Sequence, residues 1–185
     1  MSDLFSIQLQ NRQQQGRDGV WLDLPTTTEQ VQTALRQIGI SSDNPQGLFI
    51  SGYFAEEEKR IAIPYNMVLA SSVDELNFLA ARLETLSAGE RAELNAALQT
   101  PQGELSSIGR ITDFPENVEY YVHLPDVRGP VQLGDYYLNR SGMVDMPEEW
   151  KGGIDTAQFG RYVAHQEQGA FTQYGYLVKS GDEWQ

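Results

Sequence analysis

The chain has 185 residues, no cysteine, and 26 acidic against 13 basic side chains, a formal net charge of −13. A hydrophobic content of 40% excludes wholesale disorder, the lack of cysteine excludes disulfides, and the excess of acids disfavours direct binding to nucleic acid, which needs clustered Lys and Arg. No apolar run approaches the ~20 residues of a membrane span and no signal-peptide pattern opens the chain, so we expect a soluble, cytoplasmic protein.

Alternating apolar and polar residues predict three strands in the first third of the chain. The first covers residues 5–10, where Phe5, Ile7 and Leu9 share one face. An Asp-Gly turn signal precedes the second, residues 20–24, and the third covers residues 48–54. Three short strands of this kind predict a small antiparallel sheet.

Apolar spacing at i, i+3 and i+4 predicts three amphipathic helices, over residues 26–38, 72–86 and 87–99. Each begins with a Ser or Thr followed three residues later by Glu or Gln, the capping-box pattern, in the pairs Thr27/Gln30, Ser72/Glu75 and Ser87/Glu90. Gly39 follows the first helix, where a terminator belongs. The last two helices are too short to be stable alone, so we expect them to pack on their neighbours.

The last third is rich in aromatic residues and punctuated by glycine. We expect a strand over 117–124 and a strand or hairpin limb over 170–178, with helical segments at 134–139, 146–150 and 154–165. From Gly181 onward the chain is expected to fray. The fold class predicted is α+β, as three small modules: antiparallel sheet plus helix (1–66), a helical middle (67–109) and an α+β carboxy-terminal module (110–185).

The sequence offers little catalytic chemistry. His123 and His165 are the only histidines and stand 42 residues apart, so no metal-ligand spacing is present. The phosphate-loop, dinucleotide-binding and nucleophile-elbow patterns are missing, although a Ser-His-Asp triad assembles in space and need not leave a local pattern. Adjacent acids such as Glu148 and Glu149 suit a first helical turn as well as a glycosidase site. We therefore predict no enzyme, no cofactor and no metal.

The negative charge is concentrated in the middle of the chain. Residues 1–55 carry −2, residues 56–126 carry −8 and residues 127–185 carry −3. A field focused on one part of a surface steers a basic partner toward it. Large aromatic side chains beside such charge indicate a protein that binds protein.

Several stretches resemble ArdA-type antirestriction proteins. They are the central run SVDELNFLAARLETLSAGERAELNAAL, the opening Gly19-Val20-Trp21 followed by Leu24-Pro25, and the carboxy-terminal series Tyr136-Tyr137, an acidic loop over 145–149, Ile154-Asp155 and Phe159-Gly160-Arg161. The resemblance rests on the order and spacing of these segments and covers nearly the whole chain.

The resemblance implies an elongated homodimer whose carboxylates imitate the phosphates of bent B-form DNA. Such proteins occupy the DNA-binding groove of type I restriction-modification enzymes, acting on the methyltransferase core, and protect incoming mobile-element DNA. The family's antirestriction motif corresponds to residues 133–149, near the subunit interface, to which we assign Tyr136, Tyr137 and Leu138. The acids expected to face the partner are Glu84, Glu90, Glu93, Asp113, Glu116, Glu119, Asp126, Asp135, Asp145, Glu148 and Glu149.

A second hypothesis is an acidic interaction or adaptor module of a mobile element that shares the fold but binds another basic protein. Bases within or beside the acidic centre dilute the imitation of phosphates, namely Arg82, Arg91, Arg110 and Arg128. Three aromatics suit an exposed interface, Trp150, Tyr174 and Tyr176, although the core of the carboxy-terminal module needs large side chains too and is their alternative role. The two hypotheses differ in the partner they predict.

Overall fold

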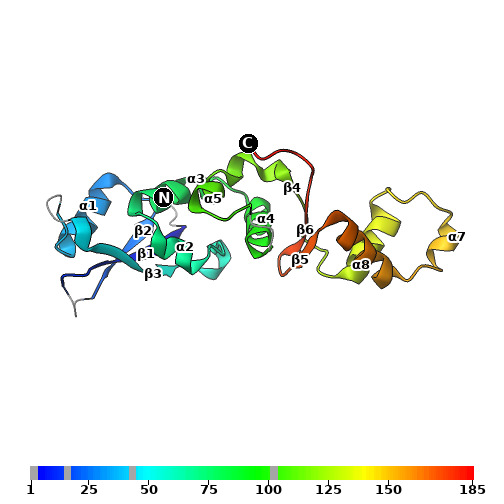
Figure 1. The fold of residues 1–185 in the computed structure, drawn as a ribbon, viewed down its shortest axis with the longest axis horizontal. Coiled ribbons are helices and arrows are strands. Elements are labelled where there is room, and N and C mark those ends of the chain that lie inside the picture. Colours follow the sequence, from blue (N-terminus) through cyan, green and yellow to red (C-terminus); the bar gives the residue numbers. More distant parts are fainter. Residues whose placement is uncertain (1–3, 15–17, 42–44, 101–103) are drawn as a thin grey trace. The chain divides into compact units, whose positions relative to one another are not determined.

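The computed structural model describes residues 4–14, 18–41, 45–100 and 104–185 (Figure 1). The chain divides into two compact units, described below one at a time: unit 1 is Met1–Ser87 with Glu104–Pro115, and unit 2 is Ala88–Gly103 with Glu116–Gln185. The described residues form two antiparallel three-stranded sheets and eight α-helices, so the α+β class is confirmed. The predicted division into three modules cuts the chain elsewhere and stays a prediction.

Unit 1 is built on a sheet of order β2-β1-β3. Its antiparallel strands are β1 (Phe5–Asn11), β2 (Val20–Leu24) and β3 (Leu48–Phe54), which confirms all three predicted strands. One face is apolar and buried, because side chains alternate across a strand, and it carries Phe5, Ile7, Leu9, Leu22, Leu24 and Ile50. The other face lacks such a cover, as Trp21 is 49% exposed.

The first helix begins and ends as its sequence predicts. In α1 (Thr28–Gln37) the Thr27 side chain accepts from the Gln30 backbone N–H and the Gln30 side chain accepts from the Thr27 backbone. Both bonds satisfy N–H groups that no helical carbonyl can reach. Gly39 has φ of +69°, a conformation that ends the helix without the steric cost a Cβ would bring.

Three further helices complete unit 1: α2 (Tyr65–Ala70), α3 (Val73–Leu83) and α5 (Ile108–Thr112). The predicted Ser72–Glu75 capping box is present at the start of α3. The Asn77 amide joins α3 to the chain after β2, since it donates to the Thr26 carbonyl (3.0 Å) and accepts from the Thr26 N–H (2.7 Å). The short α2 and α5 were not predicted.

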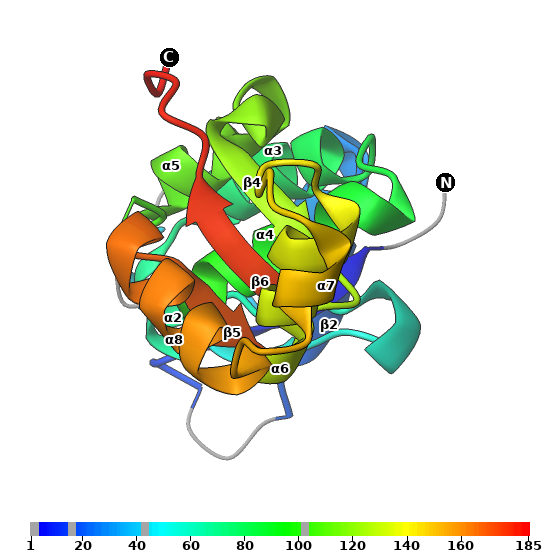
Figure 2. The same cartoon turned by 90° about the vertical axis from the view of Figure 1, so that its right-hand side faces the viewer.

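Unit 2 contains α4 (Ala88–Gln99) and a sheet of order β4-β6-β5, with β6 in the middle (Figure 2). The strands are β4 (Tyr121–Leu124), β5 (Ala170–Thr172) and β6 (Gly175–Lys179). The segment expected to form one strand or hairpin limb over 170–178 is extended, but a turn at Gln173 and Tyr174 divides it into the paired strands β5 and β6.

The strand predicted over residues 117–124 is wrong in its first half, where Val118–Tyr120 is a 3₁₀ turn. The buried side chain of Asn117 causes the difference, because its Oδ1 accepts from the Gln185 backbone N–H (2.8 Å). Trp184 packs edge-on against Tyr120, with ring centroids 5.2 Å apart. These contacts also hold the end of the chain, so the expected fraying does not reach Trp184 and Gln185.

Helices α6 (Pro130–Asp135), α7 (Glu148–Lys151) and α8 (Thr156–Glu167) make up the rest of unit 2. The helical segments predicted around 134–139, 146–150 and 154–165 are therefore confirmed, with shifted ends. Directly after α6 the chain forms a π-helical turn, η5 (Tyr136–Arg140), which was not foreseen. Asp155 caps α8 by accepting from the Gln158 N–H (2.9 Å).

Glycines allow α6 and α8 to touch backbone to backbone. A Cβ on Gly160 would lie 1.9 Å from the Pro130 carbonyl oxygen, and one on Gly134 would lie 2.0 Å from that of Thr156. The contact closes a core of Val127, Leu133, Ala164 and Tyr176. Phe159-Gly160-Arg161 thus includes a residue that must lack a side chain.

Gly160→Ala should lower the free energy of unfolding of unit 2 by on the order of 3 kcal/mol, because the added methyl forces the two helices apart. Gly152→Ala is the matched control, as nothing lies within 4 Å of its Cβ position. Denaturant unfolding of both variants measures the difference. A Gly160→Ala protein as stable as the control would contradict the close contact.

Candidate functional site

The excess negative charge is shared almost equally by the two units. The sequence of unit 1 holds 13 acids and 7 bases, net −6, and that of unit 2 holds 13 acids and 6 bases, net −7. The concentration in residues 56–126 seen along the chain is therefore divided between the units by the fold. Each unit therefore carries an excess of acids of its own.

Seven of the eleven acids predicted to face a partner are exposed. They are Asp113 in unit 1 and Glu116, Glu119, Asp126, Asp145, Glu148 and Glu149 in unit 2. Exposed carboxylates act on a partner through the solvent field. These positions suit the role that the sequence predicted for them.

The other four predicted acids, Glu84, Glu90, Glu93 and Asp135, are half-buried. Asp135 pairs with Arg140 at 3.2 Å and accepts a hydrogen bond from the Asn139 amide at 2.9 Å. Among the exposed acids, Glu148 pairs with Lys151 at 2.8 Å. Pairing of this kind offsets part of the charge a partner would meet.

Of the predicted acids, Glu93 is the least like an exposed carboxylate. Its Oε1 is buried and has no hydrogen-bond partner. Burial, and to a smaller extent the negative charge of Glu90, raise the pKa of Glu93 to about 7. At neutral pH the side chain therefore carries only part of a negative charge.

The pKa of Glu93 makes stability depend on pH. Between its usual pKa and about 7 the folded protein keeps the proton that the unfolded chain loses, so stability falls as pH rises through this range. Glu93→Gln removes the free-energy cost of ionising a buried carboxylate. It should raise the melting temperature by roughly 2–6 °C at about pH 8, with little change at about pH 5.

Thermal unfolding at the two pH values measures this effect, with Glu119→Gln as the control at an exposed acid. An equal shift at both pH values would show that Glu93 does not titrate as its burial implies.

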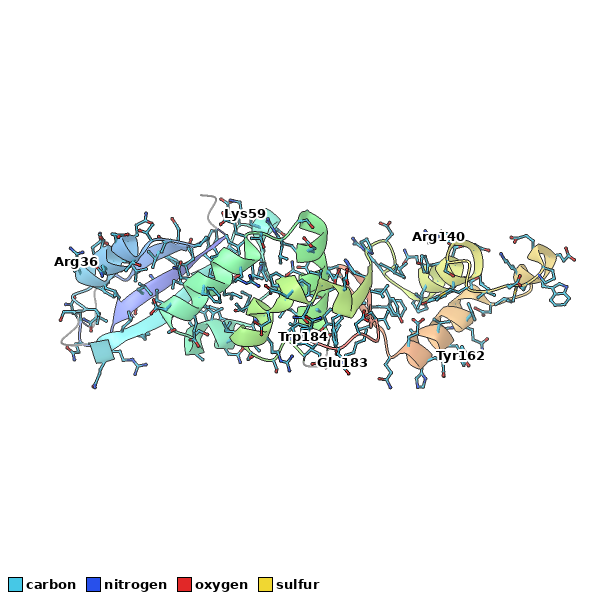
Figure 3. All side chains as sticks on the ribbon, turned by 90° about the horizontal axis from the view of Figure 1, so that it is seen from above. Arg36, Lys59, Arg140, Tyr162, Glu183 and Trp184 are labelled. Carbon is cyan, nitrogen blue, oxygen red and sulfur yellow. The ribbon has the colours of Figure 1, made fainter. Side chains whose placement is uncertain are left out.

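The structure adds two acids that the sequence analysis missed. Asp182 and Glu183 line a groove of about 480 Å³ together with Glu116 and Glu119, and Tyr120 and Trp184 are also in its wall. Figure 3 labels Glu183 and Trp184 in this segment. The contact that brings them there joins Asn117 to Gln185, 68 residues away, and no local pattern signals it.

The residues predicted for a dimer interface are largely used inside their own unit. Leu138 is 3% exposed, and the Tyr137 hydroxyl donates to Glu167 Oε1. The hydroxyl of Tyr176 donates to Glu167 Oε2 at 3.0 Å. Burial first, and then the Glu167 carboxylate, raise the pKa of both tyrosines well above their usual range, so both remain donors at neutral pH. Tyr136 is half-buried, with the Arg140 guanidinium 5.8 Å from its ring centre.

Of the aromatics named for an interface, only Trp150 is truly exposed, at 66%. Tyr176 is fully buried in the core of unit 2 and Tyr174 is half-buried, so for Tyr176 the core role is confirmed and the interface role was wrong. Its hydroxyl finds a partner in Glu167, which lets the whole ring enter the core. The sequence analysis missed Tyr162, which is 62% exposed on α8 (Figure 3).

The two histidines show no sign of a metal site. The His123 ring is 2.9 Å from the Tyr174 carbonyl oxygen, and His165 is exposed in the last turn of α8. Over the ranges that the structure describes, no group of three or more His, Cys, Asp or Glu could hold a metal ion. Within the same ranges no helix is both long and apolar enough for a membrane span.

Comparison with known proteins identifies one family. A family model described as antirestriction protein (ArdA) matches residues 15–178, most of the chain. A search of curated proteins finds no match.

Proposed function

The chain belongs to the ArdA family of antirestriction proteins, non-enzymatic inhibitors of type I restriction-modification enzymes, and from this we propose that it acts by imitating B-form DNA. In this proposal its exposed carboxylates take the places of DNA phosphates in the groove of the methyltransferase core. The same groove is then closed to incoming DNA.

The observation that carries the proposal is the set of seven exposed predicted acids in a chain of net charge −13. Duplex DNA presents about one charge per 1.7 Å of its axis, and a DNA-binding groove meets that charge with clustered Lys and Arg side chains. Fixed carboxylates attract the same basic side chains without any reaction chemistry. Because counterions are released on binding, the affinity of such an imitation falls steeply as salt rises.

The first test is competition for a type I methyltransferase core that holds labelled cognate DNA. The wild-type protein should displace the DNA, and more weakly at higher salt. The test variant neutralises four exposed acids together (Glu116→Gln, Glu119→Gln, Asp126→Asn and Glu149→Gln). It should need an at least about tenfold higher protein concentration to displace the DNA, since each exposed charge contributes up to about 1 kcal/mol to binding.

The matched control neutralises four other exposed acids, Asp18, Glu56, Glu57 and Asp74, and changes the net charge by the same amount. An equal loss in both variants would show that only total charge matters and would refute the assignment of particular acids. No displacement by the wild type at low salt would favour the alternative, an acidic interaction module for another basic protein.

We further propose that the protein is a homodimer that uses the segment Tyr136–Leu138. Two copies double the charge of −13 and extend the acidic surface. Leu138 is already buried in its own protomer, so Tyr136 is the side chain left to meet a second copy.

Tyr136→Ala should therefore shift the protein toward monomer in sedimentation equilibrium, by at least about tenfold in the dissociation constant. Tyr162→Ala, which removes a more exposed aromatic from α8, is the control and should leave the dimer intact. The opposite pattern would move the interface to α8.

A further inference from the structure

One face of the sheet in unit 1 carries aromatic and polar groups that the DNA-imitation proposal does not use. Cross-strand neighbours on this face form two rows across the sheet. We call it the platform face and define it by six residues, Asp23, Ser6 and Phe54 in one row and Trp21, Gln8 and Gly52 in the other. Trp21 and Phe54 are 49% and 58% exposed.

Gly52 leaves room for the Trp21 indole to lie on the sheet. A Cβ on Gly52 would lie 3.0 Å from Cη2 of the indole, although the two residues are on the outer strands β3 and β2. The ring therefore extends across β1, and Gly52 is buried beneath it on an otherwise open face. One side of the indole rests on the sheet and the other faces solvent.

The polar groups around the indole are held in place before any ligand arrives. Ser51 Oγ donates to Gln8 Oε1 at 3.0 Å, and Ser6 Oγ donates to Asp23 Oδ1 at 2.6 Å. Residues two apart on a strand lie about 7 Å from each other on the same face, so the Asp23 carboxylate is beside the indole. Such order lowers the entropic cost of binding.

Charge selects the kind of ligand. Asp23 is the only charged residue among the six that define the platform face. Arg12, the basic residue that follows β1, lies over the Phe49 ring instead, 5.3 Å from its centre. The adjoining groove of about 280 Å³ between β2 and α1 is lined by Trp21 and Glu29 but by no basic side chain. Hydrogen bonds from its own backbone and from Thr27 lower the pKa of Glu29, which keeps it anionic. A cation is favoured here, and a nucleic-acid base with its phosphate is not.

We propose that the platform face binds an arginine side chain on a basic partner protein. The planar guanidinium stacks on the exposed side of the Trp21 indole while an edge donates hydrogen bonds to the Asp23 carboxylate. Lysine has no plane to stack and is more strongly hydrated, so arginine is the better ligand. The identity of the partner as a type I enzyme rests on the proposed function, whereas the preference for arginine does not.

The first test follows the indole N–H resonances of the three tryptophans by NMR, during titration with tetra-arginine or tetra-lysine at low salt. The Trp21 resonance should shift at least about threefold more with tetra-arginine, and Asp23→Asn should reduce this shift. Trp150 is the internal control, because it is exposed beside Glu148 and Glu149 but has no sheet beneath it. Equal shifts at Trp21 and Trp150, or equal shifts with the two peptides, would overturn the proposal.

The second test is displacement of DNA from the methyltransferase core. Trp21→Ala should raise the concentration needed by about three- to tenfold, and Phe78→Ala, an exposed aromatic on α3, should not. Thermal unfolding checks that each variant is folded, and Asp23→Asn, which retains the indole, replaces Trp21→Ala if that variant is not.

A wild-type protein that displaces DNA with Trp21→Ala and Asp23→Asn equally effective would overturn the inference and leave the proposed function standing. A wild type that fails to displace DNA defeats the proposed function, and the peptide titration then decides the arginine site alone.

Discussion

Repulsion between like charges is the constraint under which both units are built. The sequence of each unit contains 13 acids, so local interactions must hold part of that charge in place. Glu75 accepts from the Ser72 N–H at 2.8 Å and Asp155 caps α8, where the positive end of a helix favours an anion. These acids stabilise the fold, and the field that a partner meets comes from the remainder.

Glu167 shows the opposite use of an acid. It stands in the last turn of α8, where the helix dipole disfavours a carboxylate, and its two oxygens accept from Tyr137 and Tyr176. Because those tyrosines belong to η5 and β6, the Glu167 carboxylate connects α8 to a turn and to a strand by hydrogen bonds. The segment predicted to correspond to the family's antirestriction motif is thus held by a residue some 30 positions away.

Sequence reasoning succeeded where the determining interactions are local. The strands of unit 1 and the caps at Thr27 and Ser72 follow from spacings of two to four residues, and family likeness gave the function class. It failed where partners are distant or elements short. Helices α2 and α5, of six and five residues, are too brief to show a period, and the turn at Val118–Tyr120 depends on Gln185. The burial of Glu93 likewise comes from packing that no pattern of charges along the chain reveals.

The π-helical turn η5 accommodates one residue more than an α-helical turn would. In an α-helix, residues five apart point about 140° away from each other, yet Asp135 and Arg140 meet because the Ser141 N–H bonds to the Tyr136 carbonyl at 2.8 Å, one residue further back than usual. A relative one residue shorter here would close as an ordinary α-helix, in which the acid and the base stand four residues apart and again share a face. The turn therefore takes up one residue without redirecting the chain that follows it, so this segment can change in length by one residue while the direction of the following chain is kept.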